Sequence, residues 1–195
     1  MVDNSNYLPS PGFAQVLTVG KKYIVLGLMS WPPQSFLLTV TDTGAGEWLP
    51  IELFDLVHAE LPSGWSATVS RNVPRLRTGD PTVRVTIGFA ELVSNSSYYE
   101  DLLDGKDEVV SSFGREFRKQ SLIEEVREKL EGYAERRLTA NEVSDWAIER
   151  IEFLPVDVVD ESMLSLVDVI SEMTGFTSDG VVDRDFLEKS IQRII

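Results

Sequence analysis

Residues 83–100, VRVTIGFAELVSNSSYYE, contain the change of pattern that decides the fold. Up to Val93, apolar residues largely alternate with polar or small ones, as in a β-strand that buries one face. From Ser97 onward the sequence begins Ser-x-x-Glu, the signature of a helix start, and apolar residues then recur about every 3.6 positions to the end of the chain. The sequence therefore predicts an α+β fold with a strand-rich first half and a helical second half.

The sequence before residue 83 consists of short β-branched and aromatic runs separated by glycine and proline. Residues 41–46, TDTGAG, supply the glycines that the positive φ angles of a hairpin turn require. No helical pattern interrupts these runs, so we expect a small antiparallel β-barrel or a strongly bent sheet. The predicted strands are residues 22–31, 35–41, 47–57, 66–71 and 83–92.

Three capping boxes predict helix starts at Ser97, Ser121 and Thr139. In a capping box, a hydroxyl and the carboxylate three residues later satisfy each other's backbone amides. The helix after Thr139 places Val143 and Trp146 on one apolar stripe, so we predict that Trp146 lies in the core. Such stripes predict a compact bundle with its acidic residues outside. The helices after the second capping box are expected at about 121–137, 139–155, 160–174 and 184–195.

The chain is expected to have three parts. Residues 1–12 are polar and carry prolines at positions 9 and 11, which predicts a disordered tail. Residues 13–95 are the predicted strand-rich domain, and residues 96–195 are the predicted acidic helical domain. The change of period near 94–97 is the expected junction between the two domains.

Charge is distributed unevenly along the 195 residues, which carry a net charge of −14 and no cysteine. Residues 1–95 contain 6 basic and 8 acidic side chains, whereas residues 96–195 contain 12 and 24. This charge repels phosphates and anionic lipids, so we expect a basic protein partner, no nucleic acid and no membrane. The absence of cysteine, of a signal-peptide pattern and of an apolar run of about 20 residues predicts a cytoplasmic protein.

The residue types that enzymes use do not form a recognisable constellation. His58 is the only histidine, so a zinc site or a Ser-His-Asp triad is not expected, and we predict a surface or capping role for it. Residues 44–46, GAG, lack the third glycine and the strand-to-helix context of a dinucleotide site. We therefore expect no enzymatic activity, no cofactor and no metal.

Acidic side chains concentrate in the helices predicted after Thr139, and no spacing selects two of them for catalysis. Three interpretations stay open: a solvated helix face, a carboxylate pair for acid–base or magnesium chemistry, and a surface that docks a basic protein. In the third interpretation, charge complementarity would speed association with the basic protein by about 10 to 1000 times. The candidate partner-binding residues are Asp145, Glu149, Glu152, Asp157, Asp160 and Glu161.

Two stretches resemble bacterial proteins that are encoded beside polymorphic toxins. Residues 19–27, VGKKYIVLG, followed by residues 48–54, WLPIELF, resemble small β-domains from such loci. Residues 138–147, LTANEVSDWA, with the predicted helices after them, resemble helical immunity proteins that inhibit tRNA-cleaving bacteriocins. The resemblance implies an immunity protein whose acidic helices occupy the basic cleft of a nuclease toxin.

An adaptor or regulatory protein is the alternative function. In that case the β-domain would hold a peptide at a sheet edge or in an aromatic groove. Trp31, Trp48 and Trp65 are the candidate groove residues, although large aromatic rings in strands more commonly pack in the core or at its rim.

Overall fold

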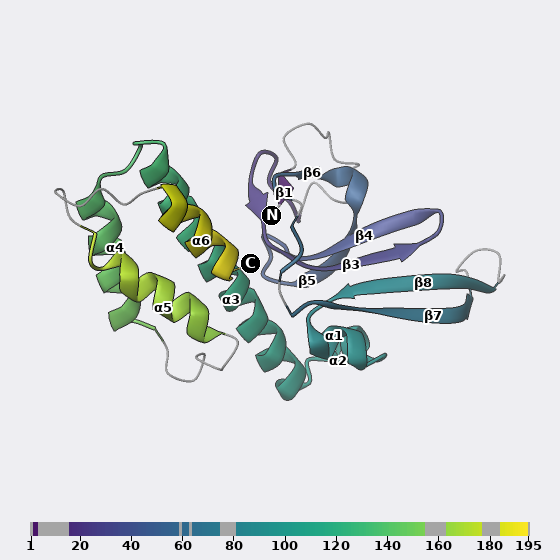
Figure 1. Ribbon diagram of the computed structural model, residues 1–195. Coiled ribbons are helices and arrows are strands. Elements are labelled where there is room, and N and C mark those ends of the chain that lie inside the picture. Colours follow the sequence, from purple (N-terminus) through teal and green to yellow (C-terminus); the bar gives the residue numbers. More distant parts are fainter. Residues whose placement is uncertain are drawn as a thin grey trace. The chain divides into compact units, whose positions relative to one another are not determined.

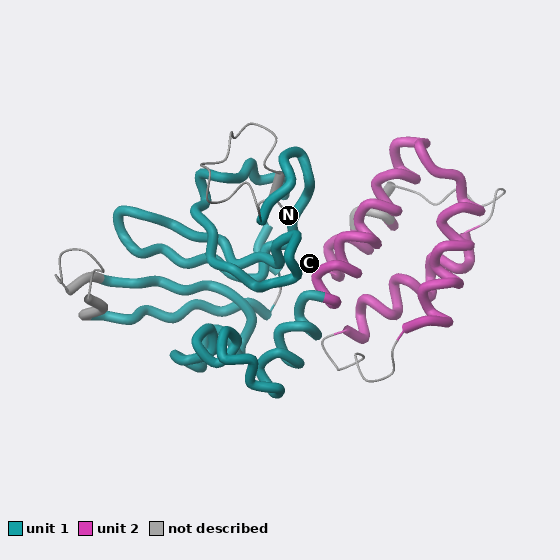
Figure 2. Tube along the Cα trace, turned by 180° about the vertical axis from the view of Figure 1, so that it is seen from behind, with its two compact units in different colours: residues 1–117 teal, residues 118–195 magenta. Residues whose placement is uncertain are grey.

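The computed structural model describes residues 2–3, 16–58, 60–62, 64–74, 81–154, 163–176 and 184–194. The chain divides into two compact units, Met1–Phe117 and Arg118–Ile195 (Figure 2). The boundary falls inside helix α3 (Asp107–Ala134), not at residues 95/96 where the change of pattern predicted it. The reason is that the first three helices contribute Leu92, Tyr98 and Phe113 to a core shared with the strands.

A five-stranded antiparallel sheet forms the centre of the first unit, in the order β5-β4-β3-β8-β7 (Figure 1). The outer strands β5 and β7 do not pair with each other, so the sheet is open. The predicted α+β fold is confirmed, and its strand-rich part is a sheet, not a closed barrel. The strands are β3 (Val25–Trp31), β4 (Gln34–Val40), β5 (Gly46–Pro50), β7 (Ser66–Pro74) and β8 (Pro81–Gly88).

The turn between β4 and β5 forms as its glycines predicted. Gly44 has a φ of 82°, and the Thr41 amide donates to the Ala45 carbonyl at 2.9 Å. Two predicted strands are too long, because β5 ends at Pro50 before η1 (Ile51–Leu53), and β8 ends at Gly88 before α1 (Ala90–Ser94). Apolar residues in these short runs fit both a strand and a helical turn, so periodicity alone could not separate them.

A second, small sheet joins β2 (Lys22–Tyr23), β1 (Val2–Asp3) and β6 (Asp55–Leu56), with β1 in the middle. Val2–Asp3 belong to the stretch predicted as a disordered tail, and for these two residues that prediction is wrong. Main-chain pairing on both sides holds β1, and such pairing leaves no signature in side-chain composition. Residue 1 and residues 4–12 of the predicted tail lie outside the described residues.

The two faces of the large sheet contribute to two separate cores, because successive strand residues point to opposite faces. Leu37 joins the core that also contains residues of the small sheet, including Tyr23. Leu38, its neighbour in β4, joins the core formed with α1, α2 (Tyr98–Leu103) and the start of α3. Among the described residues of the first unit, α1, α2 and the start of α3 therefore cover the second of these faces.

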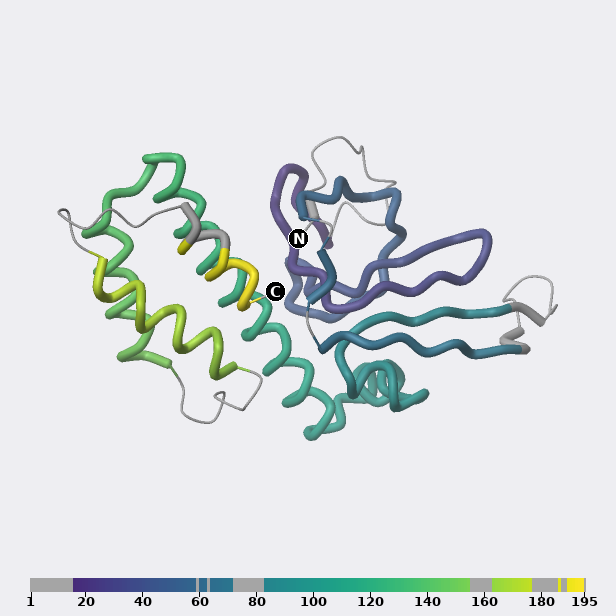
Figure 3. Tube along the Cα trace, viewed as in Figure 1, coloured from purple at the N-terminus to yellow at the C-terminus, as the bar shows by residue number. Residues whose placement is uncertain are grey.

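The described residues of the second unit form four helical segments: α3 from Arg118 onward, α4 (Ala140–Glu152), α5 (Leu164–Met173) and α6 (Arg184–Ile194) (Figure 3). α5 packs against both α4 and α6. Trp146 is only half-buried at the edge of the core, with the Lys129 ammonium 5.8 Å from its ring centre. The fully buried residues include Val126, Leu130, Val143, Ala147, Val169, Ile170 and Met173.

Only one of the three predicted capping boxes forms in full. Thr139 caps α4 with reciprocal bonds to Glu142. Ser97 precedes α2, but its side chain makes no capping hydrogen bond. Ser121 lies inside the 28-residue helix α3, so no helix starts there. Among the described helices, none is long and apolar enough to cross a membrane.

Candidate functional site

Helix α4 presents part of the predicted acidic site, and its first turn is held by the Thr139 cap. The Thr139 amide donates to Glu142 Oε2 at 2.8 Å, and the Glu142 amide donates to Thr139 Oγ1 at 3.3 Å. Val143 and Ala147 are fully buried and turn one side of α4 toward the core. The opposite side of the helix is thereby turned to solvent.

The solvent-facing side carries Asp145, Ile148, Glu149 and Glu152, which we call the α4 acidic face. Their spacing of three, one and three residues places all four on one side of a helix. All four are exposed, and the isoleucine side chain is 45% exposed. The three carboxylates make no ion pair or hydrogen bond to any residue that the structure describes, whereas Arg150 on the same helix pairs with Glu125 at 2.5 Å.

The structure brings together three of the six predicted site residues. Asp145, Glu149 and Glu152 share the α4 acidic face. Asp157, Asp160 and Glu161 lie outside the described residues. Within the described ranges, no three histidine, aspartate or glutamate side chains are grouped so that they could hold a metal ion.

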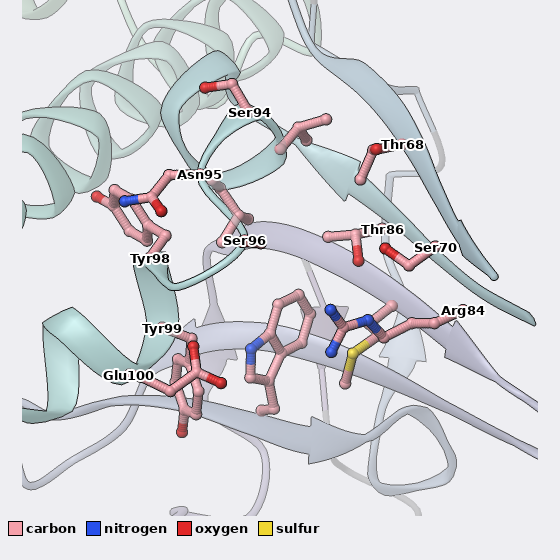
Figure 4. Close-up of a pocket in the computed structure, with 14 residues that line it drawn as sticks. Thr68, Ser70, Arg84, Thr86, Ser94, Asn95, Ser96, Tyr98, Tyr99 and Glu100 are labelled. Atoms are coloured by element: carbon pink, nitrogen blue, oxygen red, sulfur yellow. The ribbon is translucent and has the colours of Figure 1, made fainter. Parts of the chain in front are cut away.

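The first unit contains a second candidate site, a pocket of about 450 Å³ beside α1 and α2 that we call the sheet pocket (Figure 4). Its sheet wall comes from residues of four strands, and its other wall comes from residues 92–96 and 98–100. The sheet residues include Met29 on β3, Arg84 and Thr86 on β8, and Thr68 and Ser70 on β7.

Strand register explains why the sheet pocket exists. Gly27 pairs with Gly88, and a Cβ on either glycine would come within 2.7 Å of Leu92 Cδ2. The two glycines thus allow α1 to lie directly on this part of the sheet. Two residues further along the strands, Met29 pairs with Thr86, and there the sheet face opens into the pocket.

Aromatic rings close the end of the sheet pocket nearest α2. Trp48 and Tyr99 both line it, and their rings meet edge to face with centroids 6.2 Å apart. Burial raises the pKa of the Tyr99 hydroxyl above its usual value. Tyr98, also in the wall, has its pKa raised by burial, and its hydroxyl shares a 2.9 Å hydrogen bond with Ser112 Oγ.

Two charged side chains, Arg84 and Glu100, are among the described residues that line the pocket, and they lie on opposite sides of it in Figure 4. Arg84 Nε is buried and has no hydrogen-bond partner among the described residues. Trp31 Nε1 is also buried and unpaired there. Both groups only donate hydrogen bonds, so each needs an acceptor that the described residues do not supply.

The sequence prediction found only part of this second site. Trp48, named as a groove residue, lines the pocket, but Arg84 and the hydroxyl residues were missed. A signal was present: Ser66, Thr68 and Ser70 occupy every second position of β7, so one face of that strand is polar.

Comparison of the chain with protein-family models, with curated proteins and with solved structures finds no match.

Proposed function

We propose that this protein is an immunity-type inhibitor, which binds and neutralises a bacterial toxin by docking the α4 acidic face onto a basic cleft of that toxin. The observation that carries the proposal is the set of three exposed carboxylates around Ile148, none of which is paired within the described part of the chain.

The composition of the α4 acidic face favours docking over simple solvation. Asp145 and Glu149 are four residues apart, and Glu149 and Glu152 are three apart, which are spacings at which like charges destabilise a helix. A cationic partner would offset this repulsion, because its positive charge attracts all three carboxylates. Apolar groups lie beside the charges, since Ile151 is 37% exposed and Phe153 at the end of α4 is 73% exposed. Apolar residues with a polar rim are typical of protein interfaces.

Charge complementarity identifies the class of partner. Residues 118–195 contain 10 basic and 18 acidic side chains, so the second unit carries a net charge of −8. Nuclease toxins need basic clefts, because their substrates present one phosphate per nucleotide. An acidic helix face that competes with RNA for such a cleft fits the resemblance of residues 138–147 to immunity proteins of tRNA-cleaving bacteriocins.

The test uses the product of the gene adjacent to the one that encodes this protein, because immunity and toxin genes are expected side by side. We expect that product to end in a basic domain that binds this protein. Association should slow as salt rises, because the Debye length falls from about 10 Å at 0.1 M to about 3 Å at 1 M. An adjacent product without such a domain, or one that does not bind, would contradict the proposal.

A charge-neutralising variant locates the docking surface. Asp145→Asn, Glu149→Gln and Glu152→Gln together should lower the association rate by about tenfold or more. The control replaces Glu52, Glu91 and Asp104, three exposed carboxylates of the first unit, and changes the net charge by the same amount. A control that slows association as much as the α4 variant would show that total charge, not this face, matters.

An adaptor function is the second candidate, and the sheet pocket favours it. Binding that the α4 variant leaves unchanged but substitutions in the first unit abolish would identify the first unit as the binding module.

A further inference from the structure

We propose that the sheet pocket binds a carboxylate through Arg84, with an apolar group attached to that carboxylate lying against Met29 and Trp48. This site belongs to the first unit and does not depend on the α4 acidic face. The ligand class is a monocarboxylate with a neighbouring apolar group, either a small carboxylic acid or the C-terminal residue of a peptide.

Arg84 brings an unsatisfied hydrogen-bond donor to the wall of the pocket. The Arg84 Nε–H is buried without an acceptor among the described residues, and so is the Trp31 indole N–H. Ser30 and Val85 are the last recorded pair of β3 and β8, and the next step of that register places Trp31 opposite Arg84. Trp31 is not among the described residues that line the pocket, so the Arg84 Nε–H is the donor that a ligand there would satisfy by supplying an acceptor oxygen.

Hydroxyl side chains lie around Arg84 in the pocket wall. Ser70 pairs with Arg84 across β7 and β8, and Thr68 pairs with Thr86 two residues along. Since paired residues share a face, three hydroxyls and the guanidinium point to the same side of the sheet. All four side chains line the pocket, as Figure 4 shows. A planar guanidinium matches a carboxylate with two parallel hydrogen bonds, and hydroxyls can donate to its remaining lone pairs.

The charged side chains of the pocket wall restrict the charge of the ligand. Arg84 is the one cationic side chain among the described residues of the wall, and Glu100 is the one anionic side chain. A phosphate dianion would need further positive charge, and the Glu100 carboxylate would repel it. A purely cationic ligand would leave the Arg84 donors unsatisfied. A ligand with a single negative charge at the Arg84 side of the pocket would be attracted by Arg84 and would lie away from Glu100.

The volume of the pocket and its apolar residues restrict the size and the shape of the ligand. A volume of about 450 Å³ falls in the range of about 300–1,000 Å³ that is usual for small-molecule sites. Met29, Leu92 and Trp48 provide an apolar surface next to the polar strip. A ligand with one carboxylate and one aromatic or branched aliphatic group would use both surfaces at once.

The primary experiment compares an acid with its neutral amide on the wild-type protein. N-acetyl-phenylalanine and N-acetyl-phenylalaninamide would be titrated while the tryptophan indole N–H and Arg84 Nε–H signals are followed by NMR. We expect saturable binding of the acid and binding of the amide that is weaker by about tenfold or more, as expected for loss of a charge-assisted hydrogen bond. Equal binding of the two, or no saturable binding of the acid, would overturn the proposal.

Variants then test the assigned residue. Arg84→Gln should weaken acid binding by about tenfold or more and leave amide binding unchanged. The matched control is Arg71→Gln, which removes an exposed arginine of β7 that does not line the pocket. Glu100→Gln should strengthen acid binding or leave it unchanged. Weakening by Arg71→Gln equal to that by Arg84→Gln would show a nonspecific charge effect.

A further comparison distinguishes the two sources of the carboxylate and separates this site from the proposed function. Gly-Gly-Phe with a free C-terminus should bind more tightly than N-acetyl-phenylalanine if the natural ligand is a peptide end, and no more tightly if it is a small acid. The triple α4 variant should bind the acid as the wild type does. Loss of acid binding in that variant would contradict a site that belongs to the first unit alone.

Discussion

Leu92 lies on Gly88 so closely that a Cβ at Gly88 would come within 2.7 Å of Leu92 Cδ2. This contact lets α1 lie on the sheet beside the pocket. Gly88→Ala should therefore lower the free energy of unfolding by about 1–3 kcal/mol, because the added methyl group overpacks the contact. Denaturant titration would measure the change. Since Leu92→Ala removes the atom that clashes, the double variant should lose less stability than the sum of the two single variants.

Gly175→Ala is the control for that prediction. A Cβ there would approach Glu172 O only to 3.4 Å, so the substitution should change stability little. If the changes in the free energy of unfolding caused by Gly88→Ala and Leu92→Ala were strictly additive, the two residues would not be in the contact described.

Asp42 is predicted to make stability depend on pH. The Lys21 ammonium, then the Thr18 hydroxyl, hold the pKa of this carboxyl at about 2, below the ordinary value of 3.8. Because the folded-state pKa is lower than the unfolded one, Asp42 stabilises the fold fully above about pH 4 and loses this effect as pH falls toward 2. Asp42→Asn should therefore be less stable than wild type at neutral pH, and the difference should shrink in acid. Thermal unfolding from pH 7 to pH 2 would show a constant difference if this assignment is wrong.

Thr139→Ala should destabilise α4 because it removes the hydroxyl that accepts the Glu142 amide. The expected cost is about 0.5–2 kcal/mol, the usual range for loss of an N-cap. Thr139→Ser keeps the hydroxyl and should retain most of the stability, as chemical denaturation can verify.

The same cap has a pH signature. Hydrogen bonds from the Thr139 amide and hydroxyl lower the pKa of Glu142 from its ordinary value of 4.5. The stabilising effect is therefore present above about that pH and disappears as pH falls through the lowered pKa. If the Thr139→Ala penalty were the same at all pH values, the reciprocal bond would not operate in solution.

Arg136 has a φ of 60°, in the left-handed region that glycine adopts without steric cost. Arg136→Gly should raise the free energy of unfolding by up to about 1 kcal/mol. Arg118→Gly is the opposite control, because this exposed arginine lies inside α3, where glycine costs about 1 kcal/mol. If denaturant titrations showed that both substitutions change the free energy of unfolding in the same direction, the backbone conformation assigned to residue 136 would be contradicted.

Sequence patterns predicted those features that depend on neighbouring residues. The Thr139 capping box and the turn at Gly44 are determined within a few positions, so both formed as predicted. Ser121 carries the same four-residue signature as Thr139, but it lies within a helix that had already begun at Asp107. A local signature cannot show whether the preceding residues are helical, so only one of these two predictions was correct.

The α4 acidic face depends on local spacing along the chain, whereas the sheet pocket depends on how separate strands pair. Asp145, Glu149 and Glu152 share a face because helical spacing alone brings them together, and the sequence sufficed to name them. Arg84, Ser70 and Met29 come from three strands, and no spacing along the chain relates them.

By itself, the sequence determined the α+β class, the acidic second half and the outward carboxylates of α4, because these follow from composition and from periods of two or about 3.6 residues. Only the tertiary structure decided that β1 pairs between β2 and β6, that the unit boundary falls inside α3, and that a pocket opens beyond Gly27 and Gly88. The physical reason is that strand register and helix seating depend on contacts between residues far apart in the chain, whose free energy no local pattern records.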